Sequence, residues 1–441
     1  MAAAPLPSSS EVVIVGAGPS GLACALGLAF RNIPFVLVDA REGGHSDSRA
    51  VLVQANALET LEALDPDISN EIVALGIKSE SLTTLDVQER PVFCLRMSDN
   101  APYTKYGFSL LIGQHHIERI LRDHLARRGH QVQYHQRVTD VTQGPEGWSV
   151  EFLSGQRIVA RYVVAADGSK SLVRSRAGIP FLNPYTNAGA ASPTSNDLSF
   201  VVADVQLADP LPSNIPRDRL QMMVGLDGVV LTAPLLDAAP PNATDPTGGN
   251  LFRLYLGIPD TPPAAPTVEY VQNILDTRGP GSHSKQHTVP RIARMMSSSR
   301  FRTRPALADR YVQRASGSAA YVLLIGDAAH KHGPAGGQGM NMGVCDGVEL
   351  AEAIDAHRGV GGEKAGAGQD DDTGIFQAYS TRRRAIARET IDMVEGMTQL
   401  EKGGAGWVPW LRVMGLWLFF KVPGVNGMLA WKVSGLQHRK K

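Results

Sequence analysis

The chain has few cysteines and no excess of charge, and each deficit excludes a class of protein. Its 441 residues include three cysteines, Cys24, Cys94 and Cys345, which lie far apart and form no C-x-x-C motif. They offer no disulfide framework, no metal site and no redox dithiol of the usual spacing. Reduced thiols in the cytoplasm are the simple interpretation. Lysine plus arginine equals aspartate plus glutamate, 43 each, so nothing predicts a nucleic-acid partner.

Targeting and membrane-spanning segments are also missing from the sequence. The first ten residues, MAAAPLPSSS, have neither a basic start nor an apolar core, so no signal peptide is expected. The hydrophobic tail at residues 407–441 is interrupted by Arg412, Lys421 and Pro423, which leaves no run long enough to span a bilayer. Two interpretations of this tail stay open. It packs as a helical hairpin on the protein, which zero net charge favours, or it makes weak contact with a membrane surface.

Near its start the chain has the pattern of a nucleotide-binding turn. The apolar run Val12 to Val15 is typical of a strand that is buried on both faces. Gly16, Gly18 and Gly21 follow with the spacing G-x-G-x-x-G, which permits a tight turn, close approach of backbone to a pyrophosphate, and close helix packing. The helix that begins near Ser20 would present its N-terminus to the pyrophosphate. A second strand ends in Asp39, near the expected distance for a carboxylate that binds ribose hydroxyls.

A second strand–loop–helix unit, Ile325 to Asp346, stands far along the chain. The strand YVLLI runs into Gly326 and Asp327, a loop rich in glycine follows, and then a helix with an apolar stripe. Such a unit delivers a carboxylate to a cofactor's hydroxyls and directs a helix N-terminus at its negative end. The two units together predict one large bound nucleotide.

The pattern between these units predicts an α/β protein with two parts and a helical end. We expect a Rossmann-like nucleotide domain with a β-meander at 1–80, 107–180 and 306–375. A mostly antiparallel β-sheet domain at 81–106 and 181–305 interrupts it, with one face available for a ligand. Residues 376–441 form a helical C-terminal segment that includes the hydrophobic tail. The stretch from Gly359 to Gly374 has no apolar period and predicts a loop.

Three motifs in order resemble the FAD-dependent aromatic hydroxylases of the para-hydroxybenzoate hydroxylase-like type. They are GAGPSG at 16–21, VVAADGSKSLVR at 163–174 and GDAAHKHGPAGGQGMN at 326–341. The resemblance covers residues 11 to 400. It implies FAD as the cofactor, Asp327 on the ribityl chain, and backbone N–H groups near Met340 and Asn341 at the flavin's pyrimidine edge. The residues assigned to the cofactor are Gly16, Gly18, Ser20, Gly21, Asp39, Arg49, Gln114, Asp167, Asp327, Gly337, Gly339, Met340 and Asn341.

Two of these motifs also have plainer interpretations. Asp167 and Gly168 form a turn after a strand, with Ser169 or Ser171 capping the helix that follows, and this capping is expected in either case. The resemblance gives Asp167 a second role, which is to bridge the FAD pyrophosphate and the nicotinamide-binding surface. The resemblance places Pro334 between flavin and substrate. His330 and His332 are candidates for catalysis, although a histidine in a glycine loop is more often a structural hydrogen-bond donor.

The resemblance implies a monooxygenase that uses NADPH or NADH as a transient reductant and dioxygen as co-substrate. It would hydroxylate a phenolic or polyketide-type aromatic small molecule through a flavin C4a-hydroperoxide. The lack of a second G-x-G-x-x-G agrees with a reductant that binds only transiently. Two alternatives remain: a hydroxylase or epoxidase of quinone precursors or isoprenoids at a membrane surface, and a non-catalytic FAD-fold escort of lipidated partners. The candidate substrate contacts are Tyr185, Arg217, Met222, Arg253 and Tyr255.

Overall fold

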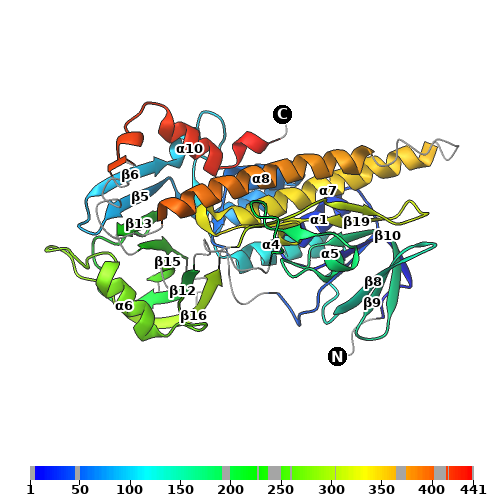
Figure 1. Ribbon diagram of the computed structural model, residues 1–441, viewed down its shortest axis with the longest axis horizontal. Helices are drawn as coiled ribbons and strands as arrows, with labels where there is room; N and C mark the ends of the chain where they lie inside the picture. Colours follow the sequence, from blue (N-terminus) through cyan, green and yellow to red (C-terminus); the bar gives the residue numbers. More distant parts are fainter. Residues whose placement is uncertain are drawn as a thin grey trace.

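The computed structural model describes residues 5–44, 50–190, 199–225, 228–236, 250–258, 261–302, 304–363, 374–401, 414–415 and 417–439. In the described residues, two large sheets are joined by two long helices, α7 (Gln338–Glu363) and α8 (Gly374–Glu401), which run along one side of the molecule (Figure 1). The mixed α/β architecture expected from the sequence is confirmed.

The first sheet has parallel strands at its centre, in the order β18-β19-β10-β1-β2. Strands β2, β1, β10 and β19 are parallel, and β18 is antiparallel to β19. Beyond β10, strands β9 and β8 continue as an antiparallel meander. The bounds are β1 Ser9–Val15, β2 Phe35–Val38, β8 Val138–Gly144, β9 Gly147–Phe152, β10 Arg157–Ala165, β18 Val312–Arg314 and β19 Tyr321–Leu324. The apolar run Val12 to Val15 lies in β1 and is buried throughout, as the pattern predicted.

Helix α7 packs against α1 (Pro19–Phe30) at very short range. A Cβ on Gly347 would lie 2.5 Å from the carbonyl oxygen of Ser20, so only glycine fits between the two helices there. The predicted loop from Gly359 starts too early, because α7 continues to Glu363. Extending an existing helix needs no new nucleation, which is why a stretch without an apolar period can still be helical.

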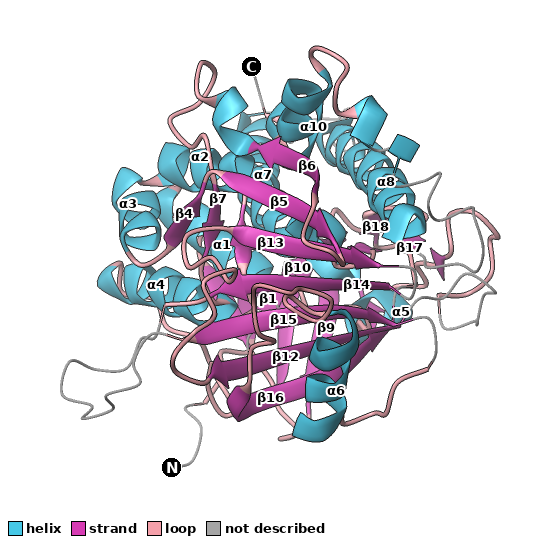
Figure 2. Ribbon diagram, turned by 90° about the vertical axis from the view of Figure 1, so that its left-hand side faces the viewer, coloured by secondary structure: helices cyan, strands magenta, loops and turns pink. Residues whose placement is uncertain are grey.

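The second sheet has the order β16-β12-β15-β14-β13-β5-β6 and is antiparallel except where β13 meets β5 (Figure 2). Its bounds are β5 Ser81–Asp86, β6 Pro91–Arg96, β12 Ser199–Leu207, β13 Leu220–Gly225, β14 Gly228–Pro234, β15 Leu251–Ile258 and β16 Ile292–Arg302. Helix α6 (Val268–Arg278) covers one face, where its residues Val271 and Leu275 pack with Val201 and Leu254. The opposite face is left to line a cavity. The domain limits given above remain a proposal, which these sheet memberships support.

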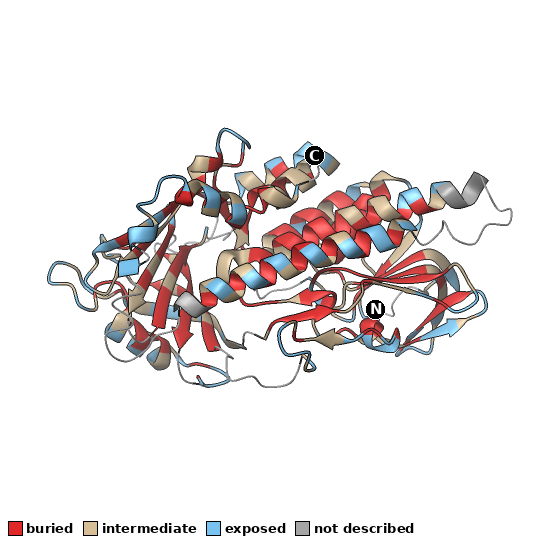
Figure 3. Ribbon diagram, turned by 45° about the horizontal axis from the view of Figure 1, so that its top comes forward, coloured by how far each residue is buried: buried red, intermediate tan, exposed pale blue. Residues whose placement is uncertain are grey.

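The remaining elements connect the two sheets and cover their edges. The helices are α2 Ala55–Leu64, α3 Pro66–Ala74, α4 Gln114–Arg127, α5 Leu172–Arg176 and α10 Val425–Val433, with short 3-10 turns η1 Met97–Asn100, η2 Gly326–Ala328, η3 Ala335–Gly337 and η4 Leu436–His438. Two three-stranded sheets contain β3 Leu52–Val53, β4 Ile77–Ser79 and β7 Ser109–Leu111, and β11 Phe181–Leu182, β17 Ala306–Ala308 and β20 His330–Lys331. The largest buried core lies between the first sheet and the long helices, whose inner sides are buried (Figure 3).

Candidate active site

One continuous cavity of about 1400 Å³ lies between the two sheets. Its first wall is formed where β1, β10 and β19 end, at Gly16, Asp167 and Asp327. Its second wall is the face of the second sheet that α6 leaves uncovered, including Met222 and Tyr255. Ligands in open α/β sheets bind outside the carboxyl ends of the parallel strands, so the first wall is where a nucleotide is expected.

The N-terminus of α1 faces this cavity through the G-x-G-x-x-G turn. Gly16 has φ +107°, and a Cβ there would lie 2.3 Å from the carbonyl oxygen of Ala166, so the turn requires glycine. A Cβ on Gly21 would lie 1.9 Å from the oxygen of Gly16, which shows the close helix–strand packing that was predicted. Gly18 and Ser20 line the cavity, and a Cβ on Gly18 would meet no atom within 4 Å. Backbone therefore borders the cavity at the place where a pyrophosphate is expected.

Asp39 lines the cavity, but its carboxylate already accepts four hydrogen bonds. The donors are the N–H of Ala17 at 2.7 Å and the N–H, Nε and Nη2 of Arg41 at 2.8–2.9 Å. Although burial of Asp39 opposes ionisation, the bonds to Arg41 and Ala17 lower its pKa below the usual value. A ribose contact at Asp39 remains a prediction, and it requires Arg41 to give up part of this pairing. Arg41 also lines the cavity, and its Nη1 atom is buried without a hydrogen-bond partner.

The glycine loop, residues 333–339, forms the part of the first wall nearest to the second sheet. Pro334, Gly337, Gly339 and Met340 all line the cavity. Gly337 has φ +63°, and a Cβ there would lie 2.8 Å from the side chain of Leu52, so the loop passes directly over β3. Because α7 begins at Gln338, backbone N–H groups of its first turn lie beside the cavity, as the sequence predicted for the flavin edge.

Asn341 holds the glycine loop in place with its side chain. Its Oδ1 accepts the N–H of Gln54 at 2.8 Å, and its Nδ2 donates to the carbonyl oxygens of Gly337 at 2.6 Å and Leu52 at 3.0 Å. Asn341 is 4% exposed and does not line the large cavity. Its side chain therefore supports the loop from behind.

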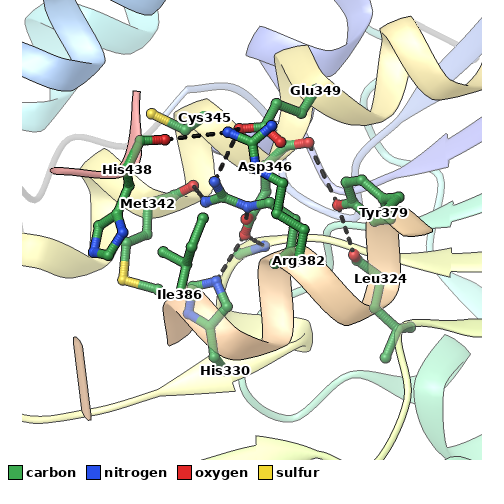
Figure 4. Close-up of polar contacts among 12 residues, drawn as sticks. Leu324, His330, Met342, Cys345, Asp346, Glu349, Tyr379, Arg382, Ile386 and His438 are labelled. Atoms are coloured by element: carbon green, nitrogen blue, oxygen red, sulfur yellow. Dashed lines mark hydrogen bonds and ion pairs between the residues drawn. The ribbon is translucent and has the colours of Figure 1, made fainter. Parts of the chain in front are cut away.

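Beneath the loop, a buried charged network surrounds Asp346 (Figure 4). Oδ1 of Asp346 pairs with Nε of Arg383 at 2.5 Å, and Oδ2 accepts the N–H of Gly326 at 2.9 Å and lies 2.7 Å from Nε2 of His330. Arg383 also pairs with Glu349 at 3.0 Å. Burial opposes ionisation of Asp346, but Arg383 and His330 hold its pKa well below the usual range. The carboxylate thus fixes the turn that carries Asp327.

The network also shows where His330 lies. His330 is 1% exposed, its Nε2 contacts Asp346, and the residue is not part of the cavity wall. The structure therefore favours the structural interpretation of His330 over the catalytic one. His332, the second histidine considered for catalysis, does line the cavity. Burial lowers the pKa of His332 to about 4, so its imidazole is neutral at pH 7, and Nδ1 lies 2.7 Å from the carbonyl oxygen of Gly333.

Ser171 caps α5, as predicted, by accepting the N–H of Arg174 at 2.9 Å, and Asp167 lines the cavity beside it. Its Oδ2 accepts the N–H groups of Leu172 at 2.8 Å and Val173 at 3.2 Å, while Oδ1 is buried without a partner. Burial raises the pKa of this carboxyl group. Arg174 supports the turn by donating to the oxygens of Ala328 and Ser169.

Gln114, at the start of α4, lines the cavity beside Ala50, shortly before β3. Its Oε1 accepts the N–H of Ala50 at 3.2 Å, and its Nε2 donates to Glu118 at 2.9 Å. Arg49, the other position assigned by resemblance, lies outside the described residues.

Of the predicted substrate contacts, Met222 and Tyr255 line the cavity. Arg253 shares a sheet face with Tyr255, but it is buried and pairs with Asp204 through two bonds of 2.6 Å. Arg217 bonds to Asn250 outside the cavity lining. Tyr185 donates to Asp392 at 2.7 Å and is also absent from the lining. Direct contact of these last three with a ligand in this cavity is therefore not supported by their positions.

The described residues fit FAD in several independent ways. The cavity exceeds the 300–1000 Å³ of an ordinary small-molecule pocket, so it has room for a dinucleotide and a second molecule. Bare backbone borders it at Gly18 and along the glycine loop. Buried polar atoms without partners, Asp167 Oδ1, Arg41 Nη1 and His332 Nε2, belong to residues of its wall. Within the described residues, no cluster of three or more His, Cys, Asp or Glu side chains could hold a metal ion.

Comparison with known proteins agrees with this geometry. The model of a family described as FAD binding domain matches residues 9–223 and 281–394, most of the chain. The chain belongs to this FAD-binding family. Rifampicin monooxygenase of Rhodococcus hoagii is 29% identical over 412 residues, which cover 90% of this chain and 72% of the relative. Pentachlorophenol 4-monooxygenase of Sphingobium chlorophenolicum is 24% identical over 98% of this chain and 71% of the relative.

Solved structures share the fold of this family member. The p-nitrophenol 4-monooxygenase of Pseudomonas putida has a TM-score of 0.77 at 21% identity and covers 99% of this chain and 100% of its own. With its family relatives, the chain is an FAD-dependent monooxygenase that uses NAD(P)H and dioxygen. The resemblance seen in the three motifs is therefore confirmed. The alternative of a non-catalytic escort protein is not supported.

Proposed function

We propose that this monooxygenase hydroxylates a phenolic or polyketide-type aromatic molecule held between the glycine loop and the second sheet. The observation that carries the proposal is that both line one continuous cavity. The sheet supplies alternate residues of its strands, mostly apolar: Phe200, Val202, Leu220, Met222, Val224, Val229, Leu231 and Tyr255. Ser81, Ser299 and Arg300 of the same sheet also line the cavity. A mostly apolar wall with few polar side chains suits an aromatic ring that bears few polar groups.

The chain's own residues have three tasks in this reaction. FAD, when bound, supplies the redox and oxygen chemistry. Gly16, Gly18 and the first turn of α1 hold its negative end, and the glycine loop leaves space for its ring. The apolar face excludes water from the reacting centre, which strengthens every polar interaction that remains there. Among the polar residues of the second sheet that line the cavity, which also include Ser81, Ser299 and Arg300, we assign Tyr255 to orient a substrate hydroxyl.

The relatives support this choice of substrate class. Their printed names are those of monooxygenases acting on rifampicin, 6-methylpretetramide, pentachlorophenol and para-nitrophenol. To test the proposal, phenols, naphthols and polyketide aromatics are added to the holoenzyme while NADPH and NADH oxidation is followed. We expect a subset to stimulate oxidation and to gain one oxygen atom by mass. If only isoprenoid or quinone precursors did so, the aromatic assignment would be wrong.

A second candidate is the same chemistry on a substrate taken from a membrane surface, which one specific observation favours. Exposed large apolar side chains gather in the C-terminal segment: Met414, Trp417, Leu418, Phe419, Val422 and Met428. Phe419 also lines the cavity. No helix in the described residues is both long and apolar enough to cross a bilayer. We expect the wild type to co-sediment with anionic liposomes and the double variant Trp417→Ser, Leu418→Ser to stay in the supernatant. Equal pelleting of the wild type and the double variant would exclude this candidate.

A further inference from the structure

The C-terminal segment, residues 417–439, closes the end of the cavity that lies at the β6 edge of the second sheet. Helix α10 packs on β6 and η1, at the edge of that sheet (Figure 2). The C-terminal segment, together with β6, η1 and α8, forms an apolar wall of six side chains, all of which line the cavity. These are Phe93, Leu95, Met97, Met397, Phe420 and Leu429.

The wall is a packed surface whose two sides come from distant parts of the chain. The rings of Phe93 and Phe420 are stacked, with centroids 4.1 Å apart and planes inclined by 4°. Leu95 and Met97 are 5% and 3% exposed and pack with Ala430 and neighbouring residues of α10. A ligand that reaches this end therefore meets side chains that are already in contact with one another.

Hydrogen bonds fix α10 at both of its ends. Nδ2 of Asn100 donates to the carbonyl oxygen of Ala430 at 3.0 Å, and Oδ1 of Asn426 accepts the N–H of Arg96 at 3.2 Å. Nε2 of Gln338, in the glycine loop, donates to the carbonyl oxygen of Val433 at 2.7 Å. The wall is thus tied to the sheet edge and to the loop beside the cofactor, which gives it a defined position relative to the reacting ring.

The chemistry of the wall restricts what can lie against it. None of its six side chains carries an N–H or O–H group, and the thioethers of Met97 and Met397 are only weak acceptors. A ligand hydroxyl or carboxylate buried against it would lose its hydrogen bonds to water without replacement, which weakens binding on the order of tenfold or more. An alkyl chain or a further fused ring would gain affinity there, by about fourfold for each buried methylene.

We propose that the apolar wall is a specificity element that selects aromatic substrates bearing an apolar extension of several carbons beyond the reacting ring. This inference rests on the proposed function, because it assumes that the reacting ring lies between the glycine loop and Met222. Phe420 and Leu429 set the length of the extension, since they come from the segment that closes this end. The polar end of the substrate then lies toward Tyr255.

The experiment uses the holoenzyme and a series of 4-alkylphenols from methyl to hexyl. Dissociation constants come from calorimetry and from the perturbation of the flavin spectrum, and NADPH oxidation is followed in parallel. For the wild type we expect the dissociation constant to fall about fourfold with each methylene until the cavity is filled. Leu429→Phe should move the best chain length toward shorter phenols, and Phe420→Ala should reduce the gain per methylene.

Met428→Ala is the matched control. Met428 is the neighbour of Leu429 on α10, but it is 47% exposed and does not line the cavity. It should leave the series unchanged. Phenols that bind with no dependence on chain length, or a Leu429→Phe variant that behaves like Met428→Ala, would overturn this inference and leave the proposed function standing. If no phenol bound or stimulated NADPH oxidation, the proposed function would fail and the inference with it.

Discussion

Replacing Arg383 with methionine should lower the stability of the protein by about 3–5 kcal/mol, the usual cost of leaving one partner of a buried ion pair alone. Asp346 is fully buried and relies on Arg383 for its opposing charge. For a chain of 441 residues this corresponds to a decrease in Tm of roughly 3–5 °C. The measurement is thermal unfolding at pH 7, with FAD release followed in the same scan, because Asp346 also fixes the turn of Asp327.

The sign of the pH dependence distinguishes this mechanism from a simple packing defect. In the wild type the pKa of Asp346 is lowered, so its contribution to stability is present above the unfolded pKa of about 3.9 and is lost in acid. In Arg383→Met the buried carboxylate lacks its cation, so the variant should lose less stability at pH 5 than at pH 8.

Two further variants test the assignment. The double variant Arg383→Met, Asp346→Asn removes the unpaired charge and should recover part of the loss. Arg119→Met, which breaks an exposed pair with Asp123, should change the stability by less than about 1 kcal/mol. Equal losses in Arg383→Met and Arg119→Met would contradict the account given for the buried network.

The second large effect is expected at Gly18, where valine should abolish FAD retention while the fold stays intact. The backbone of Gly18 has φ −76° and ψ −178°, which any residue can adopt, and a Cβ there meets no atom within 4 Å. The valine side chain would instead occupy the space above the α1 N-terminus. Losing two charge-assisted hydrogen bonds, at about 1.5–3 kcal/mol each, raises the FAD dissociation constant at least about 100-fold. The check is flavin fluorescence titration of the apoprotein, together with circular dichroism.

Gly16 provides the contrasting control two residues away. Valine at Gly16 would need an unfavourable backbone at φ +107° and would collide with the oxygen of Ala166. This variant should therefore unfold at a lower temperature as well as lose FAD. If Gly18→Val retained FAD at wild-type affinity, the position assigned to the pyrophosphate would be wrong.

Local motifs were enough to predict the cofactor side of the site. They could not predict which contacts the same residues make with other parts of the chain. The turn at Gly16 and the strand–loop–helix unit at Asp327 depend on residues that are close in sequence. Asp39 was found by spacing, but its saturation by Arg41 requires coordinates. Arg253 and Tyr255 are two residues apart in one strand, so they share a face of the sheet. The pairing of Arg253 with Asp204 of β12, in contrast, depends on the order of the strands.

The apolar wall could not be predicted, because it joins segments separated by more than 320 residues along the chain. Phe93 belongs to an ordinary apolar strand, and Phe420 to a tail that suggested either packing or membrane contact. The structure places α10 against β6, while Trp407 and Trp410 lie outside the described residues. No spacing rule connects such segments, since the contact depends on the path of every element between them.

Helix α8 connects the buried charged network to the apolar wall of the cavity. One unbroken helix carries Arg383 in the charged network under the turn of Asp327 and, fourteen residues later, Met397 in the wall of the cavity. At 1.5 Å per residue these side chains are roughly 21 Å apart along a stiff rod. The same helix therefore sets the distance between the carboxylate that fixes the cofactor turn and the apolar end of the cavity.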